Sequence, residues 1–376
     1  MILSTEPWGK MMLSKMHYAA ELAAKGHNVY FVNPPRHSSN RENVYVNDNV
    51  AIPHITIINT QPVKQGLLLR HKFPGLYRQL IKSYAKKIKA IAGNSIDELW
   101  CFNPNMFIAP KQFGAKKTLL FLYDFYKGRH VEAACKEADA LISITSVVLD
   151  HYKSEARPYL LLPHGLASSF AAIAEERIKK NDFIVQNGKK IKVGYTGNLL
   201  RQGMNTVLAK TLIEKNPQVE FHFWGPDSIK ENNVSGLSEA TQVQQDFLQF
   251  LKKSNHVVLH GVKTVSELAV EMQAMDAFIF LYSAKTDINA ASNSHKILEY
   301  LSTGKVIIST FVSQYQNNNL LVMSKDDAHF LATFTEVLAS LDRYNAAAEQ
   351  KKRIDFALEN TYHMQIERIN RFVKTL

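Results

Sequence analysis

The sequence predicts an α/β protein built from two doubly wound domains. Short apolar strands alternate with helical segments in both halves of the chain, which favours parallel sheets covered by helices on both faces. At 376 residues the chain is too long for one ordinary hydrophobic core and suits two domains. Its 46% hydrophobic and 21% charged residues are typical of a globular protein.

The first half begins with strand-like residues 1–4, which lead into a helix over 14–25. The β-branched and aromatic run at 29–32 predicts a buried strand. The pattern continues with strands at 50–58, 98–102, 118–123 and 140–144 and a helix near 129–137, and the leucines at 160–162 then lead to Pro163. We assign residues 1–180 to an N-terminal doubly wound domain.

The polar, charged segment 171–192 indicates a link, and a second alternating pattern follows it. Strands are expected at 192–195, 220–224, 256–260 and 277–282, with helices at 205–216 and 265–275. From about residue 328 the chain is helical, with no further strand expected. We assign residues 190–356 to the C-terminal domain and residues 357–376 to a separate final helix.

The segment 293–304 predicts a short helix that Gly304 ends, followed by a buried strand. Its apolar face comprises Ile297, Leu298 and Leu301. Lys296 and Glu299 share the opposite face, because residues three apart are neighbours on a helix. A helix N-terminus with a lysine in its first turn favours a diphosphate, and Glu299, about 4.5 Å further along the axis, suits ribose hydroxyls. The alternative is a Lys and a Glu exposed on an amphipathic helix.

This segment resembles the nucleotide-binding helix of GT-B glycosyltransferases of the family 1 and 4 type, which often reads Lys-x-x-Glu-Tyr-(Leu/Met)-x-x-Gly, then Pro-Val. Val306 stands where the family often has Pro. The resemblance implies two Rossmann-like domains facing a cleft, with the nucleotide sugar in the second and the acceptor in the first. It also implies that the C-terminal helix crosses back to pack on the first domain.

Further donor-binding residues are assigned at strand exits, where ligands bind in doubly wound sheets. Gly197, Asn198 and Arg201 resemble the phosphate loop that opens the family's donor domain, although a plain turn is the alternative. Gly261 and Val262 resemble the family's contact to the nucleobase. Tyr282 ends the strand before the nucleotide helix, and Asn293 and Ser294 begin that helix.

The acceptor is expected on the first domain, where Trp8 and Gly9 follow the first strand. For Trp8 the alternative is ordinary surface packing. Asp124 follows the strand at 118–123 and resembles the general base of some inverting GT-B enzymes. Its alternative is a helix cap for the segment after Lys127. Many retaining members carry two glutamates eight positions apart, but Ala291 stands where the first would fall, which weakens a retaining assignment.

No Asp-x-Asp occurs at a strand exit, so we predict a metal-independent enzyme whose leaving group is neutralised by Lys296 and the helix dipole. No other cofactor is expected. The two cysteines, Cys101 and Cys135, show no metal spacing and fit a reducing cytosol, and no signal peptide precedes the first strand. We therefore expect a cytoplasmic protein.

The net charge is +11, and eight basic residues without an acidic one lie in residues 64–89 among apolar side chains. This pattern is typical of a segment that binds an anionic membrane surface, broken here at Pro74 and Gly75. The alternative is a core-packing helix with a solvated basic face. No nucleic-acid module is recognisable, so binding of DNA or RNA is not expected.

The combined reading is a glycosyltransferase that moves a sugar from a nucleotide-diphosphate donor to a glycan or lipid-linked acceptor in surface polysaccharide biosynthesis. Two other functions stay open. One is a sugar-nucleotide epimerase of the same fold, which would need acidic residues on both sides of its site. The other is a non-catalytic module that binds nucleotide sugars or membranes.

Overall fold

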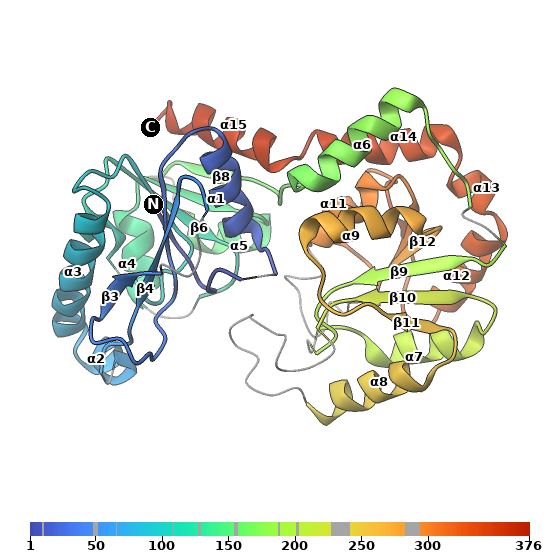
Figure 1. Cartoon of the computed structure of the whole chain (residues 1–376), viewed down its shortest axis with the longest axis horizontal. Helices are drawn as coiled ribbons and strands as arrows, with labels where there is room; N and C mark the ends of the chain where they lie inside the picture. The colour runs from blue at the N-terminus through green and yellow to red at the C-terminus, as the bar shows by residue number, and fades with distance from the viewer. Residues whose placement is uncertain are drawn as a thin grey trace. The chain divides into compact units, whose positions relative to one another are not determined.

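The computed structural model divides into two compact units (Figure 1). It describes residues 1–9, 11–47, 52–64, 66–107, 109–126, 129–153, 157–186, 189–200, 203–226, 241–282 and 294–376. The first unit comprises Met1–Gly9, Leu13–Pro163 and Ile366–Leu376, and the second consists mainly of His164–Gln365.

The described strands of the first unit form one sheet of eight, in the order β3-β4-β2-β1-β5-β6-β7-β8. They are β1 (Ile2–Leu3), β2 (Val29–Val32), β3 (Val44–Val46), β4 (Ile55–Thr60), β5 (Glu98–Cys101), β6 (Lys117–Leu122), β7 (Ala140–Ser143) and β8 (Tyr159–Leu161). All neighbouring pairs are parallel except β3 and β4. The helices of this unit are α1 (Ser14–Ala24), α2 (Gly66–Lys72), α3 (Pro74–Ile91), α4 (Arg129–Glu137) and α5 (Ser146–Tyr152), with a 3-10 turn η1 (Pro110–Phe113).

The second unit contains a parallel sheet whose six described strands run in the order β11-β10-β9-β12-β13-β14. They are β9 (Lys192–Thr196), β10 (Glu220–Trp224), β11 (Val257–Leu259), β12 (Ala277–Phe280), β13 (Val306–Ser309) and β14 (Val322–Met323). The helices are α6 (Ser168–Lys180), α7 (Thr206–Lys215), α8 (Gln242–Lys253), α9 (Val265–Glu271), α11 (His295–Ser302), α12 (Phe330–Ala339), α13 (Leu341–Tyr344) and α14 (Ala347–Leu358), with 3-10 turns η3 (Met272–Ala274) and η4 (Ser313–Tyr315). Figure 1 shows α7 and α8 along one face of β9, β10 and β11, with α9 and α11 on the other face.

Each sheet buries its own apolar core, as the alternation of strands and helices predicted. In the first unit Leu3, Val32 and Leu120 belong to one cluster with α3 and α4 side chains. In the second, Val193, Phe221 and Phe278 belong to a separate cluster. The predicted doubly wound α/β architecture is therefore confirmed, and so is the break at Pro74, where α3 begins.

The expected link at 171–192 is wrong over its first part, because α6 occupies 168–180. Arg177 of this helix is only 8% exposed and donates to Gln350 Oε1 over 2.9 Å, and it also contacts the Thr303 carbonyl. Both partners lie in the second unit, to which α6 belongs. The second unit thus starts at His164, upstream of the expected boundary between 180 and 190. The last helix, α15 (Tyr362–Val373), contributes residues to both units.

The sequence did not indicate several elements. The short strands β3 and β14 lie at the edges of their sheets. Helices α5 and α8 were also not anticipated. The two edge strands have three and two residues, too few for a pattern of alternating burial to be read.

Candidate functional sites at two sheet edges

The strand order places a topological switch point beside β9 in the second unit. β9 pairs with β10 on one side and with β12 on the other, so the chain reverses its direction of winding between β9 and β12. Gly197 follows β9, Tyr282 follows β12, and an isolated bridge joins Met204 to Tyr282. Ligands of doubly wound sheets bind at such a point, beyond the carboxyl ends of the strands.

Lys296 reaches this edge from the first turn of α11. Its Nζ donates to Tyr282 Oη over 2.6 Å and lies 5.0 Å from the centre of the Tyr282 ring. It also lies 5.5 Å from the centre of the Tyr195 ring, and Tyr195 Oη donates to Tyr282 Oη over 3.2 Å. Two buried aromatic rings therefore hold the ammonium beside the α11 N-terminus, an arrangement that favours an anion.

The loop after β9 comes within contact distance of this ammonium. A Cβ on Gly197 would lie 2.2 Å from Lys296 Nζ, and the residue has φ +150°. Gly225 after β10 is equally constrained, because a Cβ there would lie 1.8 Å from the Gly197 carbonyl oxygen. Both positions need glycine for a close approach of the backbone, as a loop that contacts phosphate does.

Asn198 adds an amide to the same loop. It is 8% exposed, and its Oδ1 accepts a hydrogen bond from Leu200 N over 3.0 Å. Its Nδ2 is buried and has no hydrogen-bond partner among the described residues. A buried donor without a partner costs free energy, so this amide is expected to gain a partner when a ligand binds.

Substituting Gly197 should weaken nucleotide binding through Lys296. In Gly197→Ala the new methyl group must displace the ammonium from its contact with Tyr282, so we expect about tenfold weaker binding of a nucleoside diphosphate. Isothermal titration with UDP, GDP and ADP measures the change. Gly26→Ala is the matched control, because Gly26 also has positive φ but nothing within 4 Å of its Cβ. Equal affinity of Gly197→Ala and the wild type would contradict the assignment.

Glu299 lies one turn beyond Lys296 and is partly buried. Burial raises the pKa of its carboxyl from 4.5 to about 7, and the Lys296 ammonium opposes this shift. A nucleoside whose ribose hydroxyls donate to this carboxylate should therefore bind more tightly as the pH rises through 7.

The raised pKa also predicts how stability depends on pH. Between pH 4.5 and about 7, Glu299 is protonated in the folded chain but not in the unfolded chain, and this difference adds to the free energy of unfolding. The added free energy is complete below pH 4.5 and is lost as the pH rises through 7. Glu299→Gln does not titrate. Its stability relative to the wild type should increase by about 1–3 kcal/mol between about pH 5 and about pH 8.5. Chemical denaturation at both pH values tests this, and a difference that does not change with pH would rule it out.

The expected nucleobase contact follows β11. Gly261 adopts φ +68° and its carbonyl accepts from Gly225 N over 2.9 Å, which places it beside the glycine loops. Val262 follows it and is partly buried. The ring of the preceding His260 stacks on Trp224 with centroids 4.5 Å apart, and its Nε2 lies 2.9 Å from Nδ1 of His222, so this ring is packed against neighbouring side chains.

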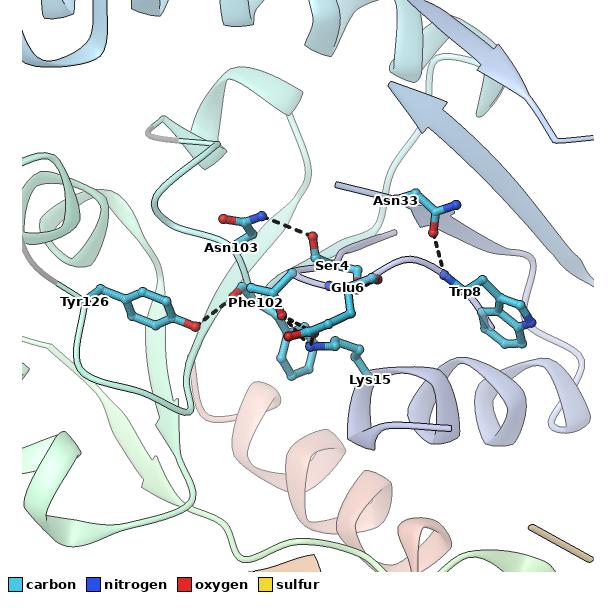
Figure 2. Close-up of polar contacts among 9 residues, drawn as sticks. Ser4, Glu6, Trp8, Lys15, Asn33, Phe102, Asn103 and Tyr126 are labelled. Atoms are coloured by element: carbon cyan, nitrogen blue, oxygen red, sulfur yellow. Dashed lines mark hydrogen bonds and ion pairs between the residues drawn. The ribbon is translucent and has the colours of Figure 1, made fainter. Parts of the chain in front are cut away.

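The first unit has its own switch point, between β1 and β5. The loop after β1 carries Trp8 and Gly9, both partly buried. Trp8 N donates to Asn33 Oδ1 over 2.8 Å, as Figure 2 shows, and its ring packs edge-on against Phe31 with centroids 5.0 Å apart. Asp124 is exposed just beyond β6, the neighbour of β5.

Comparison with solved structures identifies this architecture. The chain superposes on the UDP-forming α,α-trehalose-phosphate synthase of Burkholderia xenovorans in complex with glucose-6-phosphate, at 13% identity over 99% of both chains with a TM-score of 0.68. It also matches Anabaena Alr3699/HepE in complex with UDP and glucose (13% identity, 100% of this chain and 99% of that one, TM-score 0.65). A third match is the sucrose-phosphate synthase of Thermosynechococcus elongatus (14% identity, 100% and 98% covered, TM-score 0.65). The chain has the GT-B fold. No family model and no curated protein matches its sequence.

On the GT-B frame, the predicted residues fall into two groups. Gly197, Tyr282 and Lys296 converge in the second unit, with Asn198 and Glu299 beside them. Ser294 is the N-cap of α11 and is partly buried. Trp8, Gly9 and Asp124 belong to the first unit. Arg201 and Asn293, and Ala291 of the retaining motif, lie outside the described residues.

Sequence reasoning assigned Tyr282 to the donor site but missed Tyr195, whose ring also lies against Lys296 Nζ. Tyr195 ends the strand expected at 192–195, a position that gave no reason to place its ring beside Lys296. Tyr300 is fully buried too, and its Oη accepts a hydrogen bond from Thr196 N over 2.7 Å, which fixes the end of β9 to α11. Only the motif Glu-Tyr at 299–300 could have pointed to it.

Two further properties of the GT-B chain concern metals and membranes. No group of three or more His, Cys, Asp or Glu side chains that could hold a metal ion occurs among the described residues. Within the same residues, no helix combines the length and apolar character needed to cross a bilayer.

Proposed function

We propose that this chain is a glycosyltransferase that takes a sugar from a nucleoside-diphosphate donor bound by the second unit and transfers it to a hydroxyl of an acceptor bound by the first. The observation that carries this proposal is Lys296. A single ammonium, held by Tyr195 and Tyr282, lies beside both a helix N-terminus and the Gly197 loop at the switch point of a GT-B domain. Those three features match the charge and shape of a diphosphate.

In the proposed reaction the acceptor oxygen forms a bond to the anomeric carbon as the bond from that carbon to the diphosphate oxygen breaks. Asp124 takes the proton of the acceptor hydroxyl. The departing diphosphate gains negative charge, which Lys296 and the α11 N–H groups stabilise without a metal ion. Glu299 accepts hydrogen bonds from the ribose. Activity should therefore survive a chelator such as EDTA.

The neighbours support a nucleotide sugar as the donor. The trehalose-phosphate synthase is named as UDP-forming and holds glucose-6-phosphate, and the Anabaena protein holds UDP and glucose. A uridine diphosphate sugar is accordingly the first donor to test, with guanosine and adenosine diphosphate sugars as alternatives.

The test combines binding and turnover. Thermal shift with UDP, GDP and ADP identifies the base, and the corresponding sugar nucleotides are then incubated with mixed mono- and oligosaccharides and with a lipid-linked saccharide fraction. A transferase releases nucleoside diphosphate only when the acceptor is present. An epimerase would alter the donor sugar without an acceptor, and a binding module would do neither. Absence of any nucleotide-induced shift would contradict the proposal.

We further propose a lipid-linked acceptor in surface polysaccharide synthesis, reached at the inner face of the cytoplasmic membrane. The support comes from α2, α3 and the residue between them, where Leu68, Phe73 and Leu76 are 44%, 58% and 52% exposed. Lys72 lies among them, and residues 64–89 carry no acidic side chain. Exposed apolar side chains within a basic segment fit an anionic lipid surface.

Liposome flotation tests this surface. We expect the chain to float with vesicles that contain anionic lipid and to float less with neutral ones, and we expect Phe73→Ser combined with Leu76→Ser to reduce flotation about tenfold. Phe311→Ser is the matched control, because Phe311 is 49% exposed in the second unit. Equal recovery with neutral and anionic vesicles would remove the basis for the proposal.

A further inference from the structure

An ion pair is enclosed at the switch point of the first sheet. Lys15 on α1 contacts Glu6 Oε2 and Thr5 Oγ1 with its Nζ, and Thr5 Oγ1 donates to the same carboxylate oxygen over 2.5 Å. The two charged side chains are only 11% and 17% exposed. Figure 2 shows them pointing toward each other where the chain leaves β1.

The loop that carries Glu6 is fixed from both neighbouring strands. Ser4 Oγ donates to the Glu6 carbonyl over 2.5 Å, and Asn103, just after β5, donates its Nδ2 to the Ser4 carbonyl over 3.2 Å. On the other side, Asn33 after β2 accepts from Trp8 N. These bonds appear in Figure 2 as a line of contacts along the carboxyl edge of the sheet. The Glu6 carboxylate is therefore held in one place, as binding groups need to be.

The net contribution of this ion pair to the stability of the fold is small. Removing two charges from water costs several kcal/mol, which mutual attraction only offsets, so apolar residues of similar volume would serve stability about as well. The cost of burying the Lys15 ammonium appears in its pKa. Burial lowers the pKa of Lys15 to about 7, although the negative charge of Asp124 acts to raise it. A charged pair at a ligand-binding edge suggests a role in binding.

We propose that Glu6 binds hydroxyl groups of the acceptor sugar, and that Lys15 and Thr5 are positioning residues that hold its carboxylate. Both contacts described above use Oε2, so Oε1 is the oxygen that accepts from the acceptor. The ligand class is a polyhydroxylated saccharide. The inference rests on the proposed transferase function and adds to it the residue that recognises the acceptor.

The test uses the full chain and a glycan array of mono- and oligosaccharides as the probe. We expect the wild type to bind a subset of the array and Glu6→Gln to bind that subset at least about tenfold more weakly, the loss typical of a hydrogen bond to a charged group. In the transfer assay the same variant should raise KM for the acceptor about tenfold with kcat changed far less. Lys25→Met is the matched control, because Lys25, just after α1, also pairs with a glutamate of the first unit, Glu367 of α15.

A double variant separates binding from a purely structural role. Lys15→Met leaves Glu6 buried without its cation and should lower the unfolding temperature, whereas Lys15→Met with Glu6→Gln should recover it. We expect the double variant to recover stability but not glycan binding. Recovery of both would overturn the inference, as would a wild type that binds no saccharide or a Glu6→Gln variant that binds normally. In each case an intact thermal shift with UDP, GDP or ADP would leave the proposed function standing, and its absence in the wild type would instead refute that function.

Discussion

Lys296→Ala is expected to lower turnover by about 100- to 1,000-fold, the loss typical when one group that stabilises developing charge is removed. The alanine also removes the donor to Tyr282 Oη. The fold should survive, because Lys296 lies on the face of α11 opposite the buried Ile297, Leu298 and Leu301. Release of nucleoside diphosphate in the presence of acceptor measures the effect, and circular dichroism confirms folding.

Two companion variants sharpen this result. Lys296→Arg keeps the charge but has a longer, planar head group, so it should retain a small part of the activity. Lys210→Ala is the matched control, because Lys210 is an exposed lysine on α7 of the same unit, paired with Glu214. Near-normal turnover by Lys296→Ala would refute the assigned role, since the other described residues assigned to the donor site supply no second full positive charge.

The sequence predicted best the elements whose residues form a recognisable pattern along the chain, independent of contacts with distant segments. The helix at 293–304 was recognisable because its apolar positions recur at helical spacing and a glycine ends it, and α11 buries those same positions. α6 was missed because its charged residues look like a linker. Arg177 of that helix is buried, and two of the groups that accept its hydrogen bonds, the Thr303 carbonyl and Gln350 Oε1, lie more than 100 positions away in the sequence.

The residues of the candidate sites also divide into those that a local motif identifies and those that only the tertiary structure brings together. Lys296, Gly197 and Tyr282 could be named from the sequence, but Tyr195, whose ring also lies against the ammonium, could not. Tyr195 and Tyr282 meet only because β9 and β12 are neighbours in the sheet. The enclosed pair of Glu6 and Lys15 was missed for a related reason. A buried lysine looks like any surface lysine until the packing of α1 against the β1 exit is known.

Asp124→Asn is the second substitution with a large expected effect, a fall in transfer of about 100- to 10,000-fold, because an amide cannot accept the proton of the acceptor hydroxyl. Asp124 is exposed beyond β6, and its charge acts on the enclosed Lys15, so it faces the same edge as Glu6. The two carboxylates then have separate roles, Glu6 in binding the acceptor and Asp124 in removing its proton. The substitution should therefore lower kcat and leave nucleotide affinity unchanged.

The control for this variant is the same substitution at the opposite edge of the sheet. Asp97 precedes β5 and pairs with Lys116 at the surface, so Asp97→Asn should transfer sugar at the wild-type rate. A slow hydrolysis of the donor by water, measured without acceptor, should persist in Asp124→Asn if the donor site is intact. Full transfer activity in Asp124→Asn would dismiss it as the base and would favour the simpler role of a helix cap, because a cap affects stability and not the chemical step.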